Sequence, residues 1–128
     1  MNNRSSSCVF CNLPNDRIIT ESDTCLVIYD GYPVTELHTL IIPKRHAETY
    51  FDLTADERRD IEGHLEKERK RILKSDSNVT GFNIGMNNGE DAGQTVMHCH
   101  VHLIPRRKGD IDDPRGGVRG VIPDKRIY

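Results

Sequence analysis

The chain has 128 residues, a length typical of one domain that buries its own hydrophobic core. It carries 18 basic and 20 acidic residues, for a net charge of −2, and this balance argues against nucleic acid or an acidic membrane surface as the main partner. It also contains no apolar run of membrane-spanning length and no signal-peptide pattern, so we expect a cytoplasmic protein whose cysteines stay reduced.

The first part of the chain contains three short segments with the composition of β-strands. After a polar, serine-rich start over residues 1–7, which we expect to be flexible, Ile, Val, Leu and Thr are concentrated in residues 17–21, 25–30 and 38–43. Ser-Asp and Asp-Gly-Tyr-Pro turn signals separate these segments. The pattern predicts antiparallel strands.

A single long helix is predicted over residues 54–74. Thr54 and Glu57 have the spacing of a capping box, and apolar residues such as Ile61 and Ile72 recur at helical spacing through a heavily charged stretch. We interpret the many charges as a solvated outer face with i,i+4 pairs.

Two further strands are predicted over residues 81–86 and 96–105. The loop between them, residues 87–94, is rich in Gly and Asn, which tolerate positive φ angles. The whole pattern predicts an α+β domain in which a five-stranded antiparallel sheet is accompanied by one long helix and, as an option, one short helix.

The sharpest feature is the presence of His98, His100 and His102 in the last predicted strand. Side chains alternate faces along a strand, so the three histidines should share one face. The opposite face would then be apolar and would consist of Met97, Cys99, Val101 and Leu103. Buried imidazoles need partners, which leaves two chemical interpretations: metal ligation by all three, or phosphoryl chemistry by some of them.

Cys8 and Cys11 have the two-residue spacing of a zinc half-site. A structural zinc needs four ligands, and His46 and His98 are candidates for the remaining two. The alternative is a thioredoxin-like redox pair, but that motif belongs between a strand and a helix, and Cys8 precedes the first predicted strand. We favour zinc.

Together these residues resemble the histidine triad (HIT) family, whose signature of alternating histidines and apolar residues is matched here. The matching segments are residues 38–46, 83–88, 93–96 and 98–104. The resemblance covers most of residues 8–107, which we expect to form a HIT domain, followed by a C-terminal extension over residues 108–128 that packs on or near the site.

The resemblance implies a role for each residue of the site. His100 would be the nucleophile that attacks an α-phosphate, with His102 and His38 in support and with Gln94 and Thr95 assisting the phosphate and the leaving group. The nucleotide-binding residues that it implies are Asp30 as ribose ligand, Asn83, Asn87, Gly93, Gln94 and Thr95.

Some bacterial members of the family bind a structural zinc, and the resemblance implies the same ligand set here: Cys8, Cys11, His46 and His98. It implies one zinc per chain, no catalytic metal, and a homodimer with a sheet continuous across two chains. Two residues depart from the family pattern: Leu37 stands where many members have glycine, and Cys99 occupies a usually aliphatic position.

The tail resembles an extension found in some bacterial members. It begins with a group of cations that could reach the distal phosphates of a dinucleoside polyphosphate, or else form a solvated tail or a dimer contact. These cations are Arg106, Arg107, Lys108, Arg115 and Arg119.

The resemblance thus implies a nucleotide hydrolase that cleaves at the α-phosphate through a nucleotidyl-histidine intermediate. The expected substrates are diadenosine tetraphosphate or related dinucleoside polyphosphates, with no nucleic acid or membrane as partner. The alternatives are a phosphoramidase acting on adenylated amines, a transferase that passes the nucleotidyl group to phosphate or a sugar phosphate, a non-catalytic zinc-stabilised nucleotide-binding module, and a metal carrier that uses all three triad histidines.

Overall fold

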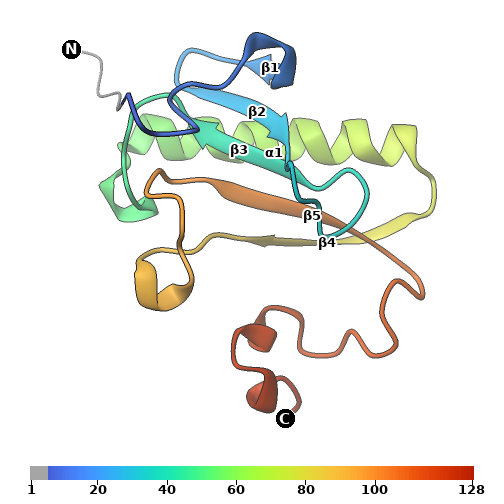
Figure 1. The fold of residues 1–128 in the computed structure, drawn as a ribbon. Coiled ribbons are helices and arrows are strands. Elements are labelled where there is room, and N and C mark those ends of the chain that lie inside the picture. The colour runs from blue at the N-terminus through green and yellow to red at the C-terminus, as the bar shows by residue number, and fades with distance from the viewer. Residues whose placement is uncertain (1–5) are drawn as a thin grey trace.

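The computed structural model describes residues 6–128, so the flexible start expected over residues 1–7 lies mostly outside the described part of the chain. A five-stranded antiparallel sheet forms the centre of the molecule, with the spatial order β1-β2-β3-β5-β4 (Figure 1). Its strands are β1 (Ile18–Glu21), β2 (Cys25–Tyr29), β3 (Thr39–Pro43), β4 (Val79–Gly85) and β5 (Val101–Arg107). The α+β class and the five antiparallel strands expected from the sequence are confirmed.

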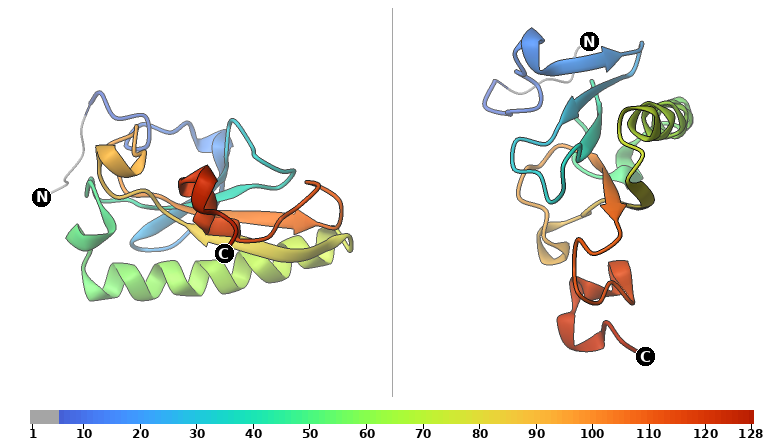
Figure 2. Two further views of the ribbon diagram at one scale, coloured as in Figure 1. Left: turned by 90° about the horizontal axis from the view of Figure 1, so that it is seen from below. Right: turned by 90° about the vertical axis from the view of Figure 1, so that its right-hand side faces the viewer.

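One long helix, α1 (Ala55–Ser75), covers one face of the sheet (Figures 1 and 2). The Thr54 side chain accepts a hydrogen bond from the Glu57 N–H, and the Glu57 carboxylate accepts one from the Thr54 N–H, so the predicted capping box is confirmed. The described connections also contain short 3-10 helices: η1 (Asn15–Arg17), η2 (Tyr50–Asp52), η3 (Glu90–Ala92), η4 (Gly117–Val121) and η5 (Pro123–Lys125).

The two faces of the sheet carry different apolar clusters, as a period-two alternation of side chains requires. The face towards α1 contributes Cys25, Val27, Ile41 and Val101, which pack with Ile61 of the helix. The opposite face contributes Leu26, Ile28, Leu40 and Ile42, against which Phe10 and Leu13 of the N-terminal segment pack. The N-terminal segment and α1 therefore lie on opposite sides of the same sheet.

The inner side of α1 also buries polar groups, which its charge pattern did not reveal. His64 is 2% exposed, and its Nε2 lies 2.9 Å from the hydroxyl oxygen of Ser22. The hydroxyls of Ser22 and Thr24 both donate to Asp60 of the helix. A wholly solvated charged face is therefore an incomplete description of this helix.

The strand of the triad starts later than predicted, at Val101 instead of residue 96. Residues 96–100 do not form a β-strand, and the Cys99 N–H donates a hydrogen bond to the carbonyl of Ala47. The prediction that Met97 continues the buried apolar face is wrong, because Met97 lies in this irregular stretch and is 39% exposed. The expected alternation holds for Cys99, Val101 and Leu103, which are all buried.

The C-terminal extension leaves β5 and folds beside β4, the edge strand of the sheet (Figure 1). It contains the two short helices η4 and η5. Among residues 6–128, no helix is both long and apolar enough to cross a membrane.

Candidate active site and metal centre

His38 is held at the end of a loop that leads into β3. Its side chain is buried, and its Nδ1 accepts a hydrogen bond from the backbone N–H of Val34 at 3.0 Å. Leu37, just before it, has a φ of 72°, a left-handed conformation that glycine adopts without strain. The leucine side chain packs against a cluster formed by Ile72, Val79 and Leu103. The loop thus takes the glycine-like turn even though glycine is absent.

The hydrogen bond from Val34 to His38 determines which ring nitrogens of His38 and His102 carry hydrogen. Because Nδ1 of a neutral His38 accepts from Val34, its Nε2 carries the hydrogen and donates to Nδ1 of His102 at 2.9 Å. His102 then carries its own hydrogen on Nε2. Burial lowers the pKa of His38, and burial together with the neighbouring histidines lowers the pKa of His102 to about 4, so both rings are neutral near pH 7.

His100 has the tautomer of a nucleophile. Its Nδ1 lies 2.8 Å from the carbonyl oxygen of His98, which only accepts hydrogen bonds, so Nδ1 is the protonated nitrogen. Nε2 of the neutral ring keeps its lone pair. The backbone of one triad histidine therefore orients the ring of the next.

The four predicted metal ligands are brought together from three parts of the chain. Sγ of Cys8 and Sγ of Cys11 lie 3.3 and 3.5 Å from Nδ1 of His98, and Sγ of Cys11 lies 3.3 Å from Nδ1 of His46. One ligand atom from each of the four residues lies within 4.8 Å of the others. Two thiols and two imidazoles at this spacing suit a tetrahedral structural zinc.

The hydrogen bond on the far side of His98 supports the same assignment. Its Nε2 donates to the carbonyl oxygen of Pro43 at 2.7 Å, which leaves the lone pair of Nδ1 facing the two cysteines. Burial lowers the pKa of His98 and so favours the neutral ring that a metal requires. The residues present therefore fit a zinc ion.

A second cluster of potential ligands consists of Asp30, His38 and His102. Its geometry is less suited to a metal, because Nε2 of His38 bears the hydrogen that is donated to His102. Ligation through that nitrogen would require the hydrogen to move to Nδ1, where it would face the N–H of Val34. The donor set of Asp30, His38 and His102 therefore supports hydrogen bonding in this place rather than metal ligation.

A cavity of about 380 Å³ opens in front of His100, and we call it the His100 cavity. It brings together most of the residues predicted to bind nucleotide or assist catalysis: Asp30, Asn87, Gly93, Gln94, Thr95, His100 and His102. Its apolar wall includes Val9, Phe10, Ile28, Leu40 and Val96. A cavity lined by both polar and apolar groups suits a nucleotide.

A second cavity of about 500 Å³ adjoins the first, and we call it the tail cavity. The two share Asp30, Tyr32, Asn87 and His102. The tail cavity is otherwise mostly apolar and includes Val34, Ile84, Ile104, Val118 and Val121. Asn83 lies here, on β4, and its side-chain oxygen accepts a hydrogen bond from Arg106.

Gln94 acts in this structure as a brace of the loop that precedes the triad. Its side-chain oxygen accepts from the Gly89 N–H, and its amide nitrogen donates to the carbonyls of Glu48 and Val96. Thr95 is exposed at the mouth of the His100 cavity, and Gly93 reaches its position with a positive φ of 96°. Thr95 therefore offers its hydroxyl to the cavity, whereas the polar atoms of the Gln94 side chain are engaged within the chain.

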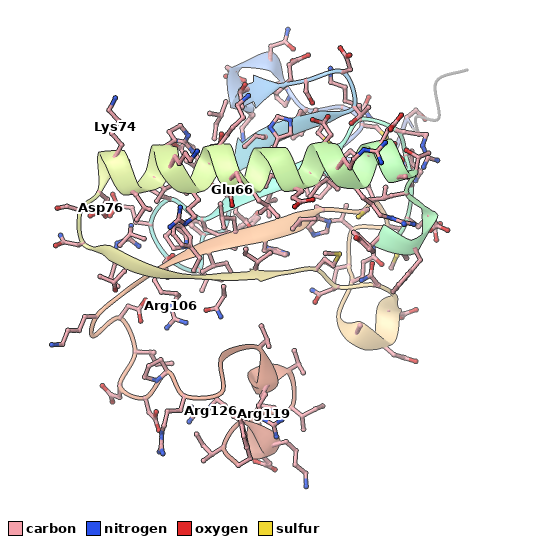
Figure 3. All side chains as sticks on the ribbon, turned by 180° about the vertical axis from the view of Figure 1, so that it is seen from behind. Glu66, Lys74, Asp76, Arg106, Arg119 and Arg126 are labelled. Carbon is pink, nitrogen blue, oxygen red and sulfur yellow. The ribbon has the colours of Figure 1, made fainter. Side chains whose placement is uncertain are left out.

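Most of the tail cations have partners within the chain. Arg106 pairs with Asp110, Arg107 with Asp76 and Arg115 with Asp113. Arg119 donates to the carbonyl of Lys125 and stacks over the ring of Tyr128. Figure 3 shows Arg106 at the sheet, whereas Arg119 and Arg126 lie out in the tail.

Sequence reasoning missed the apolar wall of the His100 cavity. Phe10 lies between the two cysteines of the zinc motif, and its ring centroid is 4.9 Å from that of His100. Ile28 and Leu40 were predicted only as strand residues. The available signal was alternation within β2 and β3, which places these two side chains on the face opposite α1.

Comparison with known proteins agrees with this geometry. The model of the HIT domain family matches residues 14–109, and the chain belongs to the HIT family. A Zn-bound histidine triad family protein from Mycobacterium smegmatis is 37% identical and superposes with a TM-score of 0.72 over 81% of this chain and 78% of the other.

Two relatives carry names that state an activity. The adenosine 5′-monophosphoramidase of Candida albicans is 37% identical over 111 residues, which is 80% of this chain and 72% of the relative. The asymmetrical bis(5′-nucleosyl)-tetraphosphatase of Schizosaccharomyces pombe is 42% identical over 81 residues, which is 63% of this chain but 44% of the relative. Hydrolases of both phosphoramide and polyphosphate bonds are therefore among its relatives.

Proposed function

We propose that the chain is a nucleotide hydrolase that cleaves at the α-phosphate through a nucleotidyl intermediate on His100. The observation that carries this proposal is the hydrogen bond from Nδ1 of His100 to the carbonyl of His98, which leaves Nε2 as a free nucleophile beside a nucleotide-sized cavity. A neutral imidazole with one nitrogen held in this way attacks through the other.

The reaction has two steps. In the first, Nε2 of His100 forms a bond to the α-phosphorus while the bond to the leaving group breaks; the nucleoside polyphosphate departs as an anion with the bonding electron pair, and the ring, still bearing hydrogen on Nδ1, becomes positively charged. In the second, water forms a bond to the phosphorus while the bond to Nε2 breaks, AMP is released, the proton of the water passes to solvent and the neutral ring is restored. Because His38 fixes the tautomer of His102, the Nε2–H of His102 and the hydroxyl of Thr95 supply donors for phosphate oxygens.

The two adjoining cavities favour a dinucleoside polyphosphate such as diadenosine tetraphosphate as substrate. The His100 cavity has room for one nucleoside with its α-phosphate, and the tail cavity, entered past His102, offers apolar surface for the second base. The second candidate is an adenosine phosphoramidate, which is favoured by the identity to the C. albicans phosphoramidase. A small amine would leave the tail cavity unused.

The same proposal includes one structural zinc per chain, held by Cys8, Cys11, His46 and His98. A bound zinc would supply a fixed tetrahedral crosslink between the N-terminal segment, the loop after β3 and the triad. A cytoplasmic location fits this site, because zinc needs thiols that have not been oxidised to a disulfide.

A homodimer is also part of the proposal, and the edge of β4 supports it. Within residues 6–128, β4 pairs with β5 on one side and has no strand on the other. An unpaired strand edge presents backbone donors and acceptors that suit pairing with β4 of a second copy, and light scattering of the purified protein tests it.

The test of the reaction is intact-mass spectrometry after brief mixing with diadenosine tetraphosphate, with product analysis over time. We expect a transient AMP adduct on the wild type and none on His100→Ala, with AMP and ATP as products. His64→Gln, which changes a buried histidine of α1 outside both sites, is the matched control and should still form the adduct. AMP binding without adduct or products would favour an adenosine phosphoramidate as the substrate first, and the non-catalytic nucleotide-binding module second.

A further inference from the structure

The segment that carries the two zinc cysteines also forms part of the nucleotide pocket. Residues 8–11 supply two thiols to the metal cluster, and the two residues between them, Val9 and Phe10, line the His100 cavity. The described chain has no helix or strand before η1, and these residues are held by packing, by the contacts of the metal cluster and by hydrogen bonds from Asn12 to the carbonyls of Cys8 and Val9.

Phe10 connects the two sites directly. Its ring stands edge-on to His98, with 6.0 Å between centroids, and its centroid lies 4.9 Å from that of His100. It also packs against the apolar cluster of β2 and β3 that includes Ile28 and Leu40, two further apolar residues of the cavity. Displacement of Phe10 would therefore remove a wall of the cavity and a neighbour of the nucleophile.

His98 provides a second connection. Its side chain offers Nδ1 to the two cysteines, while its backbone carbonyl accepts the hydrogen bond from Nδ1 of His100. A metal that fixes the ring of His98 therefore also restrains the peptide group that orients the nucleophile.

We propose that zinc and nucleotide bind cooperatively, because residues 8–11 serve at once as metal ligands and as a wall of the nucleotide pocket. Phe10 is then a positioning residue that transmits the state of the metal site to His100. This inference rests on the proposed nucleotide binding and zinc site, but it does not depend on turnover. Coupling between two sites is reciprocal, so nucleotide must raise zinc affinity by the factor by which zinc raises nucleotide affinity.

The experiment measures AMP binding by calorimetry to the zinc-loaded protein and to protein stripped with a chelator, and zinc affinity by competition with a chromophoric chelator with and without AMP. We expect both affinities to change by the same factor, about tenfold or more, within the range usual for coupled sites. Circular dichroism checks that the stripped protein keeps its sheet and helix.

Two variants separate the coupling from general destabilisation. Phe10→Ala should bind zinc with its four ligands intact but bind AMP weakly whether or not zinc is present. Phe51→Ala, at a phenylalanine that is 76% exposed and outside the cavity, should keep the full coupling.

Equal AMP affinity for folded protein with and without zinc would overturn the inference and leave the proposed hydrolase standing. Failure of the zinc-loaded protein to bind AMP at all would overturn both. Full coupling in Phe10→Ala would also contradict the inference, because it would remove Phe10 from the connection between the two sites.

Discussion

The backbone N–H of Val34 donates a hydrogen bond to Nδ1 of His38, and through this contact a main-chain group determines which nitrogen of His38 carries its hydrogen. The effect passes to His102, which receives that hydrogen at its own Nδ1. The side chains that assist the proposed reaction are therefore ordered by the loop before β3 as well as by the triad strand.

Replacement of His38 by Phe should lower the rate of adduct formation with little effect on AMP affinity. The ring volume is kept, but the donor to His102 is lost, and a net hydrogen bond of about 1 kcal/mol corresponds to roughly fivefold in rate. Rapid-quench measurement of the adduct tests this. His38→Gln, which retains an N–H donor, should recover part of the rate, and a rate unchanged in His38→Phe would contradict the assigned role.

The lowered pKa values of His38 and His102 predict a loss of stability in mild acid. Between pH 6.5 and about pH 4 the unfolded chain takes up a proton at His102 while the folded protein does not, so the free energy of unfolding falls as the pH falls through that window. The lowered pKa of His38 acts in the same direction. Urea unfolding at pH 7, 6, 5 and 4 measures the slope. His102→Gln should show a shallower dependence than the wild type, and identical slopes would refute the assignment.

The four cysteines should separate into two classes when zinc is removed. Cys8 and Cys11 should be protected by the metal and react with a thiol reagent once a chelator is added. Burial raises the pKa of Cys25 to about 12 and that of Cys99 to about 11, so these two thiols should stay inert until the protein unfolds. Mass spectrometry after labelling with iodoacetamide counts the modified residues; labelling of Cys25 in the folded protein would contradict the prediction.

At position 37, substitution by glycine should destabilise the protein no more than substitution by alanine, which reverses the usual order of stability. At most positions glycine is less stable than alanine by about 0.5–1 kcal/mol, but a left-handed residue gains about 1 kcal/mol or more from the freedom of glycine. Leu37→Gly should therefore unfold at the same or higher urea concentration than Leu37→Ala. Leu73 packs on the same cluster from within α1 and is the reference position. Leu73→Gly should unfold at a lower urea concentration than Leu73→Ala.

The tail cavity should govern the choice of leaving group. A charge introduced by Val118→Asp or Val121→Asp should raise the KM for diadenosine tetraphosphate about tenfold, since apolar contact with the second base is lost, while adenosine phosphoramidate is cleaved as before. Ile122→Asp, which is exposed in the same tail but does not line the cavity, is the control. An equal effect on both substrates would assign these valines to stability or assembly.

The parts of the fold that depend on local patterns were predictable. Segments rich in Ile, Val, Leu and Thr between turn signals located the first three strands, and the spacing of Thr54 and Glu57 located the start of α1. Pairing partners and strand ends depend on contacts that are distant in sequence, which is why β5 begins only at Val101: the preceding residues take part in the metal cluster and in a bond to Ala47.

The candidate site was predictable where a residue type limits the chemistry, and less so where packing decides. Two thiols and two imidazoles have few uses other than a metal, so the cluster around His98 could be proposed from residue types and spacing. The role of Phe10 depends on how an irregular segment folds over the sheet, and the buried Gln94 is recognised as a brace only when its three hydrogen bonds are seen.

The position of α1 opposite the N-terminal segment has a consequence for how this molecule can change over evolutionary time. Side chains of β2 and β3 that face α1 secure the folded state, whereas their neighbours that face Phe10 shape the His100 cavity. Selection for another base could therefore exchange Ile28 or Leu40 while the helix side stays constant. A sheet divided in this way allows substrate preference to diverge without a new hydrophobic core.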